Sequence, residues 1–262
     1  MKTVLLCLVI VFCNGCNRMV NRVSFFPDKS DPVVSADNLP PNTTLVSIET
    51  PDHEKLSCYF LSAPSTKLLI YYHGNAQNID MRLPELAKYR DLGINVLGVG
   101  YRGYGRSTGN PSEAGVYCDG EAALQYATDS LGVPMEAIIL CGRSIGTTVA
   151  VNTAQKKNIG GLILITPLSN GREFARSHHI GFLSWFLGNP FDNQTKCKNI
   201  NAPILIIHGI EDEIIPYELG LKLYEAFQGK KKLVTIPGGK HNNLERVDPK
   251  AYWGAIEAFL EK

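Results

Sequence analysis

The length and composition of this chain are those of an ordinary globular protein. It has 262 residues, of which 44% are hydrophobic and 19% charged, with 24 glycines and 15 prolines, and these values exclude disordered, collagen-like and coiled-coil proteins. The 26 basic and 25 acidic residues nearly balance, and no like-charged block is longer than Lys230–Lys232, so no nucleic-acid partner is expected. A domain of this size buries most of its apolar surface, so its seven cysteines are not needed as cross-links.

The first sixteen residues have the pattern of an export signal. Lys2 precedes an apolar stretch over 3–13, about half of the roughly 20 residues that span a membrane. A Gly-Cys pair then ends at Cys16 and resembles the bacterial lipobox, with Cys13 where a lipobox usually has leucine. We therefore expect a signal peptide over 1–15, acylation of Cys16 and an exported lipoprotein held on a membrane of the bacterial cell envelope by that lipid. A secreted or periplasmic protein with an ordinary signal peptide and an uncleaved anchor are the alternatives.

The rest of the chain divides into a lead-in and one domain. Residues 16–44 hold several prolines and no period, so we predict a lipidated N-terminus and tether with little regular structure. Over 45–262, two antiparallel strands come first, and short apolar runs then alternate with helical patterns. The strands are predicted at 45–49, 56–61, 68–72, 94–99, 137–140, 162–165, 204–207 and 233–236, and the helices at about 80–91, 112–131, 145–156, 217–228 and 249–261. This order predicts an α/β fold with a mostly parallel sheet of about eight strands and helices on both faces.

Two segments fit the pattern Gly-x-Ser-x-Gly, and only one has the surroundings that a nucleophile needs. Such a serine must lie on a tight turn directly between a strand and a helix, which exposes its hydroxyl at the carboxyl edge of the sheet. Ser144 follows a predicted strand and precedes a predicted helix, whereas Ser107 lies in a glycine-rich loop with Pro111 just beyond. We therefore predict Ser144 as the nucleophile and interpret Ser107 as structural.

A serine hydroxyl attacks only when a base removes its proton and an acid orients that base. Two later strands are followed by Asp212 and His241, in the chain order of nucleophile, acid and base that this fold uses. We choose Asp212 as the acid, with its neighbours Glu211 and Glu213 as substitutes and Asp192 as a weaker rival. His241 is the only histidine after Asp212 and is predicted as the base.

An acyl-transfer reaction also needs two N–H donors for its oxyanion. One is predicted from the backbone of Ile145, directly after the serine, and the other from Asn75, with Ala76 as the alternative, in the loop after strand 68–72. The adjacent pair His178 and His179 could suggest a metal, but neighbouring side chains rarely face one ion. No metal and no cofactor are therefore expected.

Five stretches of the chain resemble the α/β-hydrolase superfamily over roughly residues 45–262. They are similar above all to a branch of membrane-associated serine hydrolases that includes eukaryotic protein depalmitoylases and bacterial relatives classed with serine aminopeptidase-like hydrolases. The stretches are His73–Ala76, Tyr101–Ser107, Gly142–Gly146, His208–Glu213 and Gly239–Asn242. The resemblance implies the same triad, Ser144, Asp212 and His241, and hydrolysis of carboxylic esters or thioesters through an acyl-enzyme. The substrate is then a small molecule or an acylated group. A peptidase or amidase with the same triad and a non-catalytic binding lipoprotein are the alternatives.

In this superfamily the interval that here spans about 167–200 often forms a cap over the nucleophile. Its apolar residues suit acyl chains or a membrane surface, although packing of one amphipathic helix explains them as well. They are Ile180, Phe182, Leu183, Trp185, Phe186, Leu187 and Phe191. Arg172 and Arg176 in the same interval are interpreted as solvated, with recognition of an anionic group as the alternative.

Overall fold

The computed structural model describes residues 21, 24–29, 39–178 and 188–261. The predicted signal peptide, Cys16, most of the predicted tether and the cap segment 179–187 lie outside these ranges. Within these ranges, no helix has the length and apolar character needed to cross a membrane.

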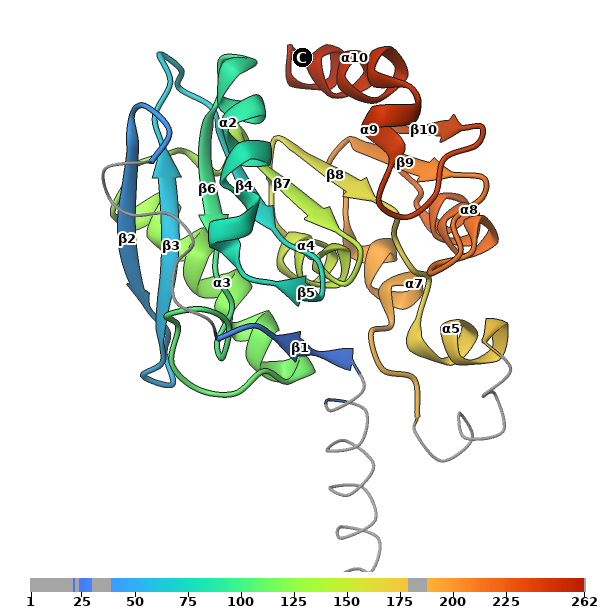
Figure 1. Cartoon of the computed structure of the whole chain (residues 1–262), viewed down its shortest axis with the longest axis horizontal. Coiled ribbons are helices and arrows are strands. Elements are labelled where there is room, and N and C mark those ends of the chain that lie inside the picture. The colour runs from blue at the N-terminus through green and yellow to red at the C-terminus, as the bar shows by residue number, and fades with distance from the viewer. Residues whose placement is uncertain (1–20, 22–23, 30–38, 179–187, 262) are drawn as a thin grey trace, which may run out of the picture.

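An eight-stranded sheet forms the centre of the molecule (Figure 1). Its spatial order is β10-β9-β8-β7-β4-β6-β3-β2. The strands are β2 (Thr43–Glu49), β3 (Lys55–Leu61), β4 (Leu68–Tyr72), β6 (Asn95–Val99), β7 (Ile138–Arg143), β8 (Gly161–Ile165), β9 (Ile204–Gly209) and β10 (Lys231–Ile236). β3 pairs antiparallel with β2 and β6, and the remaining pairs are parallel. The predicted mostly parallel sheet is confirmed.

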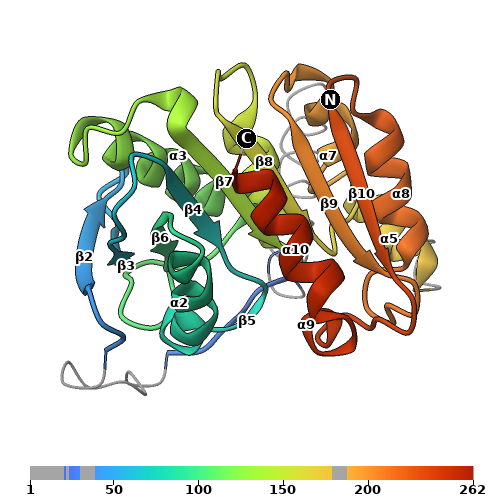
Figure 2. The same cartoon turned by 90° about the horizontal axis from the view of Figure 1, so that it is seen from above.

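Helices cover both faces of this sheet, as Figure 2 shows from above. They are α2 (Leu83–Asp91), α3 (Glu113–Asp129), α4 (Gly146–Ala154), α5 (Gly171–Ser177), α7 (Asn193–Lys196), α8 (Tyr217–Ala226), α9 (Leu244–Val247) and α10 (Pro249–Leu260), with short 3-10 turns at 79–82, 135–137 and 197–199. Side chains alternate along β4, so Leu68 and Ile70 share a core with α3, α4 and α8, and Leu69 and Tyr71 share one with α2 and α10. Both faces are therefore buried, which explains the continuous apolar runs of the strands.

The described part of the lead-in contains one short strand. Phe26–Pro27 form β1, a two-residue strand that pairs in parallel with β5 (Ala76–Gln77), far along the chain. The neighbouring Phe25 is buried. A strand this short has no readable period, so its sequence reads as irregular. β1 is thus a short regular element within a lead-in that was predicted to hold little regular structure.

Candidate active site

The turn between β7 and α4 carries Ser144. Its φ of 54° lies in the left-handed region that residues other than glycine seldom adopt, and its N–H donates to Ile165 O at 2.9 Å. A Cβ on Gly142 would lie 2.5 Å from Gly146 O, and one on Gly146 would lie 2.1 Å from Tyr72 O. Both glycines therefore provide the space in which the strand turns sharply into the helix.

Ser144, His241 and Asp212 meet at the carboxyl edge of the sheet. His241 Nε2 lies 3.0 Å from Ser144 Oγ, and His241 Nδ1 lies 2.9 Å from Asp212 Oδ2 and 3.1 Å from Oδ1. The three residues follow β7, β10 and β9 respectively. When Nδ1–H donates to the carboxylate, Nε2 is left to accept the serine proton. The structure therefore brings the three predicted residues together in hydrogen-bond contact.

Asp212 is held as a carboxylate by four donors. Its Oδ1 accepts the backbone N–H groups of Ile214 at 2.9 Å and Ile215 at 2.8 Å. Burial alone would raise the pKa of this carboxyl, but hydrogen bonds from His208, His241 and the Ile215 N–H outweigh burial and hold its pKa well below the ordinary value. Asp212 is therefore ionised at neutral pH, in the state that orients an imidazole.

His208 is a contact of Asp212 to which the sequence analysis assigned no role. The ring is fully buried, and its Nε2 lies 2.9 Å from Ile215 O and 3.3 Å from Asp212 Oδ2. A Cβ on Gly220 would lie 2.1 Å from His208 Nδ1, so α8 fixes the other side of the ring. The spacing of four residues between His208 and Asp212, on one strand-end turn, was the signal available in the sequence.

The rival acids lie elsewhere. Glu211 and Glu213 are exposed, and the nearest approach of Glu213 is a backbone contact, in which its Oε2 accepts the His241 N–H at 3.4 Å. Asp192 caps α7 by accepting the Thr195 N–H at 3.1 Å. Of the four candidates, Asp212 is the one placed on the His241 ring.

The loop after β4 runs beside Ser144. A Cβ on Gly74 would lie 3.5 Å from Ser144 Cβ, so the next residue, Asn75, follows directly on this close approach. Its side-chain Oδ1 accepts the Phe26 N–H at 2.8 Å and the Tyr104 O–H at 3.3 Å. The Asn75 and Ile145 backbone N–H groups as oxyanion donors stay a prediction.

His73 begins this loop and is a packing residue. Its ring lies 4.3 Å from that of Tyr101 and 5.2 Å from that of Tyr104, centre to centre. Burial lowers the pKa of His73 to about 3, so it is neutral, and its Nδ1 donates to Gly74 O at 2.7 Å. This hydrogen bond stiffens the backbone directly beside Ser144.

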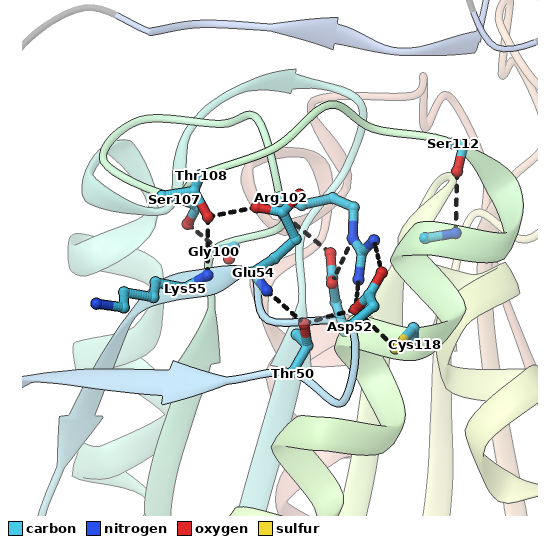
Figure 3. Close-up of polar contacts among 12 residues, drawn as sticks. Thr50, Asp52, Glu54, Lys55, Gly100, Arg102, Ser107, Thr108, Ser112 and Cys118 are labelled. Carbon is cyan, nitrogen blue, oxygen red and sulfur yellow. Dashed lines mark hydrogen bonds and ion pairs between the residues drawn. The ribbon is translucent and has the colours of Figure 1, made fainter.

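The second Gly-x-Ser-x-Gly segment lies against the β2–β3 hairpin, in a group of polar contacts around Arg102 that is here named the clamp (Figure 3). The Ser107 hydroxyl donates to Gly100 O at 3.0 Å and accepts the Ser57 N–H at 2.9 Å. Both hydrogen-bonding directions of this buried hydroxyl are thus used on backbone groups, as expected for a structural serine.

Arg102 forms the centre of that clamp. Its Nε and backbone N–H donate to Asp119 at 2.7 and 2.8 Å, and its two terminal nitrogens donate to Asp52 at 2.6 and 2.9 Å (Figure 3). Asp52 lies in the turn between β2 and β3, and Asp119 lies on α3. The guanidinium therefore joins the hairpin, the loop after β6 and α3.

The described ends of the cap interval provide few side chains for a ligand. Phe191 is buried, and Arg176 is exposed, while Arg172 Nε donates to Gly188 O at 3.3 Å. His178 Nε2 lies 2.8 Å from Ile214 O, and His179 lies outside the described residues. In the part of the chain that the structure describes, no group of three His, Cys, Asp or Glu side chains is placed to hold a metal ion.

The cysteines of the domain have packing environments. Cys58, Cys118, Cys141 and Cys197 carry free thiols. Cys141, directly before the serine turn, is buried, and its Sγ lies 3.6 Å from Tyr89 OH. Burial raises the pKa of this thiol far above its ordinary value, so it stays protonated.

The protein has a mostly parallel sheet that is covered on both faces. A serine lies on a strand-to-helix turn, and a histidine and an aspartate come from later strand ends. Together these features define the class of α/β hydrolases. Solved structures agree with this fold. An esterase of Pyrococcus furiosus has a TM-score of 0.73 at 21% identity and covers 90% of this chain and 96% of its own. An alpha-beta hydrolase of Vibrio vulnificus has a TM-score of 0.72 at 21% identity, over 86% of this chain and 83% of its own.

Sequence relatives give the particular family, although no protein-family model matches the chain. An uncharacterized protein of Mycobacterium tuberculosis is 31% identical over 243 residues, 91% of this chain and 86% of that protein. Alpha/beta hydrolase domain-containing protein aho-3 of Caenorhabditis elegans is 34% identical over 194 residues, 74% of this chain. The alignment spans only 57% of that nematode protein. Alpha/beta hydrolase domain-containing protein 17B of Xenopus laevis is 33% identical over 73% of this chain and 66% of its own. The chain belongs to the α/β-hydrolase superfamily.

Proposed function

We propose that this protein is a serine hydrolase that cleaves carboxylic ester or thioester bonds. The observation that carries the proposal is the continuous contact from Ser144 Oγ to His241 Nε2 at 3.0 Å and from His241 Nδ1 to Asp212 at 2.9 Å. A serine so placed loses its proton to the imidazole as it attacks, and the ionised carboxylate stabilises the imidazolium that forms.

The reaction proceeds in two steps, acylation of Ser144 and hydrolysis of the acyl-enzyme. Ser144 Oγ attacks the acyl carbon while its proton moves to His241 Nε2, and the oxyanion is bound by the backbone N–H groups of Asn75 and Ile145. The bond to the leaving alcohol or thiol then breaks, and that group takes the proton from His241. Water, deprotonated by the same Nε2, next attacks the acyl-enzyme; the bond from the acyl carbon to Ser144 Oγ breaks, His241 returns the proton to Oγ, and the carboxylic acid leaves.

Relatives and neighbours support ester chemistry. Several structural neighbours are named esterases, and one of them, esterase 2 of Thermogutta terrifontis, was solved phosphoramylated by tabun. Covalent capture of this kind is what an activated serine allows. The resemblance to membrane-associated hydrolases and the predicted lipid on Cys16 add the proposal that the enzyme works at a membrane of the cell envelope on small or acylated substrates.

Covalent labelling tests the proposal directly. The full chain, Ser144→Ala and Ser107→Ala are each treated with a fluorophosphonate, and the adduct is mapped by mass spectrometry. We expect an adduct at Ser144 in the wild type and in Ser107→Ala, and no adduct in Ser144→Ala. An adduct on Ser107, or no adduct on a folded wild-type protein, contradicts the proposal.

The bond that is cleaved needs a second experiment. Matched ester, thioester and aminoacyl-amide substrates with one acyl group are compared by kcat/KM. An amine is a poorer leaving group and needs more proton donation from His241 than an alcohol or thiol. We therefore expect the ester and thioester to react faster, and a preference for the amide would instead identify a peptidase or amidase.

A further inference from the structure

The residues Phe25–Asp28, here named the N-terminal strap, lie against the loop that carries Asn75. β1 pairs with β5, with Phe26 opposite Ala76 and Pro27 opposite Gln77, and Figure 1 shows the two short strands side by side below the main sheet. The Phe26 N–H donates to Asn75 Oδ1 at 2.8 Å. A segment from the start of the chain thus binds the side chain of a residue whose own N–H is a predicted oxyanion donor.

The strap is fixed at both of its ends. Phe25 is only 5% exposed, and its ring packs edge-on against Phe191 of the cap interval, with ring centres 6.1 Å apart. At the other end, the Gly105 N–H donates to Asp28 O at 2.7 Å. The strap therefore connects the cap interval and the loop after β6 to the loop beside Ser144.

Asn75 receives hydrogen bonds from two directions. Besides the Phe26 N–H, its Oδ1 accepts the Tyr104 O–H at 3.3 Å, and Tyr104 packs on His73 of the same loop. An amide side chain that is bound in this way restricts rotation of its own backbone. The direction of a backbone N–H beside the serine determines how well it binds an oxyanion, because such donors act within a narrow range of distance.

We infer that the N-terminal strap is a positioning element for the oxyanion loop, and that Phe26 N–H and Asn75 Oδ1 form its working contact. This inference rests on the proposed function. The strap touches no reacting atom, so its removal is expected to slow acyl transfer while substrate binding is largely kept. It also gives the N-terminal segment a catalytic effect in addition to any role in anchoring.

A pair of variants at one position isolates the working contact. In the full chain, Phe26→Ala keeps the backbone N–H and Phe26→Pro removes it. We expect kcat for p-nitrophenyl butyrate to be about tenfold lower in Phe26→Pro than in Phe26→Ala, with KM changed less than about twofold. Loss of a whole oxyanion donor lowers kcat by about 10²–10³, and a displaced donor should lower it by less. Melting temperatures, measured beside the rates, report any loss of fold.

Asn75→Ala tests the same contact from the other side and keeps the backbone N–H of residue 75. We expect a loss of kcat at least as large, because Asn75→Ala removes the acceptor of both the Phe26 N–H and the Tyr104 O–H. The double variant Phe26→Pro/Asn75→Ala should be no slower than Asn75→Ala alone, because the Phe26 contact is already absent there. Phe25→Ala should also lower kcat by loosening the strap, whereas Leu45→Ala, an exposed truncation on the edge strand β2, should not.

Three results overturn the inference. They are equal kcat in Phe26→Ala and Phe26→Pro, effects that add in the double variant, and a loss explained wholly by KM or by unfolding in all strap variants. If Phe26→Pro does not fold, Asn75→Ala and Phe25→Ala decide the question. A folded wild-type protein without esterase activity refutes the proposed function and this inference with it, whereas an active wild type with unaffected strap variants refutes this inference alone.

Discussion

The two Gly-x-Ser-x-Gly segments share a pattern of residues and differ in everything around the hydroxyl. The Ser107 hydroxyl donates a hydrogen bond to Gly100 O and accepts one from the Ser57 N–H. Neither partner is a base that could take its proton. Ser144 lies on a left-handed turn with Oγ on His241 Nε2. The comparison teaches that the motif alone carries no chemistry. The reactivity proposed for Ser144 depends on a strained turn that keeps the hydroxyl from the backbone and places it on a base.

The glycines of the two segments serve different purposes as well. Gly105 and Gly109 have φ values of 51° and 80°, so they permit the backbone path of a loop. Gly142 and Gly146 have no such requirement, and a Cβ on either would meet backbone atoms within 2.5 Å. Because Gly142 and Gly146 have no side chains, β7 and α4 can approach closely on either side of Ser144. The Gly-x-Ser-x-Gly pattern alone does not show this.

The largest expected difference between the two serines is in rate. Ser144→Ala should lower kcat for p-nitrophenyl butyrate by about 10⁵–10⁶, the loss typical of a triad nucleophile. Ser107→Ala should keep kcat near wild type and lower the free energy of unfolding by about 1–3 kcal/mol, because it leaves the buried Ser57 N–H and Gly100 O unpaired. Initial rates and urea unfolding measure both. A slow Ser107→Ala enzyme with normal stability would contradict the structural interpretation.

Asp212→Asn tests the acid behind the base. The amide cannot hold His241 in the tautomer whose Nε2 accepts a proton, so we expect kcat to fall by about 10⁴ with the fold intact. Glu211→Gln, a neighbouring exposed change with no contact to the His241 ring, is the matched control and should remain active. If Glu211→Gln were the slower variant, the acid would be assigned to the wrong residue.

Arg102→Leu tests the clamp around Ser107 through stability. The change leaves Asp119, which is fully buried, without its partner, and breaking a buried ion pair in this way costs about 3–5 kcal/mol. Lys88→Met removes a surface pair with Glu245 and should cost less than about 1 kcal/mol. Urea unfolding at pH 7 compares them, and equal losses would show that the clamp adds no more than a surface contact.

Gly146→Ala and Gly109→Ala compare the second glycine of each segment. At Gly146 the new Cβ meets the rigid backbone of Tyr72, so we expect a loss of about 3 kcal/mol and slower fluorophosphonate labelling as α4 is displaced. At Gly109 it meets the flexible carboxylate of Glu54, and the cost is that of a left-handed residue, about 1–2 kcal/mol, with labelling unchanged. Thermal unfolding and labelling rates distinguish the two outcomes.

The smallest effect is a dependence of stability on pH. Hydrogen bonds from Arg102 and Thr50 hold the pKa of Asp52 well below its ordinary value. A carboxyl whose pKa is lower in the folded state stabilises the fold above its unfolded pKa of about 3.9, and this contribution disappears as the pH falls. Because Asp52 is half exposed, wild type should exceed Asp52→Asn by less than about 1 kcal/mol at pH 7. Urea unfolding should show a smaller difference in free energy of unfolding between wild type and Asp52→Asn at pH 3.5 than at pH 7. A larger difference at pH 3.5 would contradict the lowered pKa of Asp52.

The sequence was most informative where an element was long and apolar. Strands such as β4 and β9 are buried on both faces, so their runs of apolar residues predicted the sheet. The placement of Ser144, Asp212 and His241 was predictable too, because strand ends collect on one edge of a parallel sheet. Their catalytic roles stay predictions.

Short elements, and contacts made by the residues behind the triad, could not be predicted from the sequence. α5 and α7 have seven and four residues, too few for a helical period, and α7 depends on the Asp192 cap. β1 has two residues, and each pairs with a residue of β5 that follows 50 positions later, Phe26 with Ala76 and Pro27 with Gln77. His208 lies within β9, and its spacing of four residues from Asp212 is compatible with a contact but does not determine one, because the path of the turn after the strand decides whether the two side chains meet.

The chain order of the site has a consequence for biosynthesis. Ser144 is made 97 residues before His241, and His241 follows β10, which is an edge strand and the last strand of the sheet. A ribosome-bound chain can therefore form the central strands and the serine turn while the imidazole is still unsynthesised. On the proposed mechanism, the hydroxyl has no base until His241 is made and β10 docks on β9, so activity begins only after this last strand of the described sheet has folded.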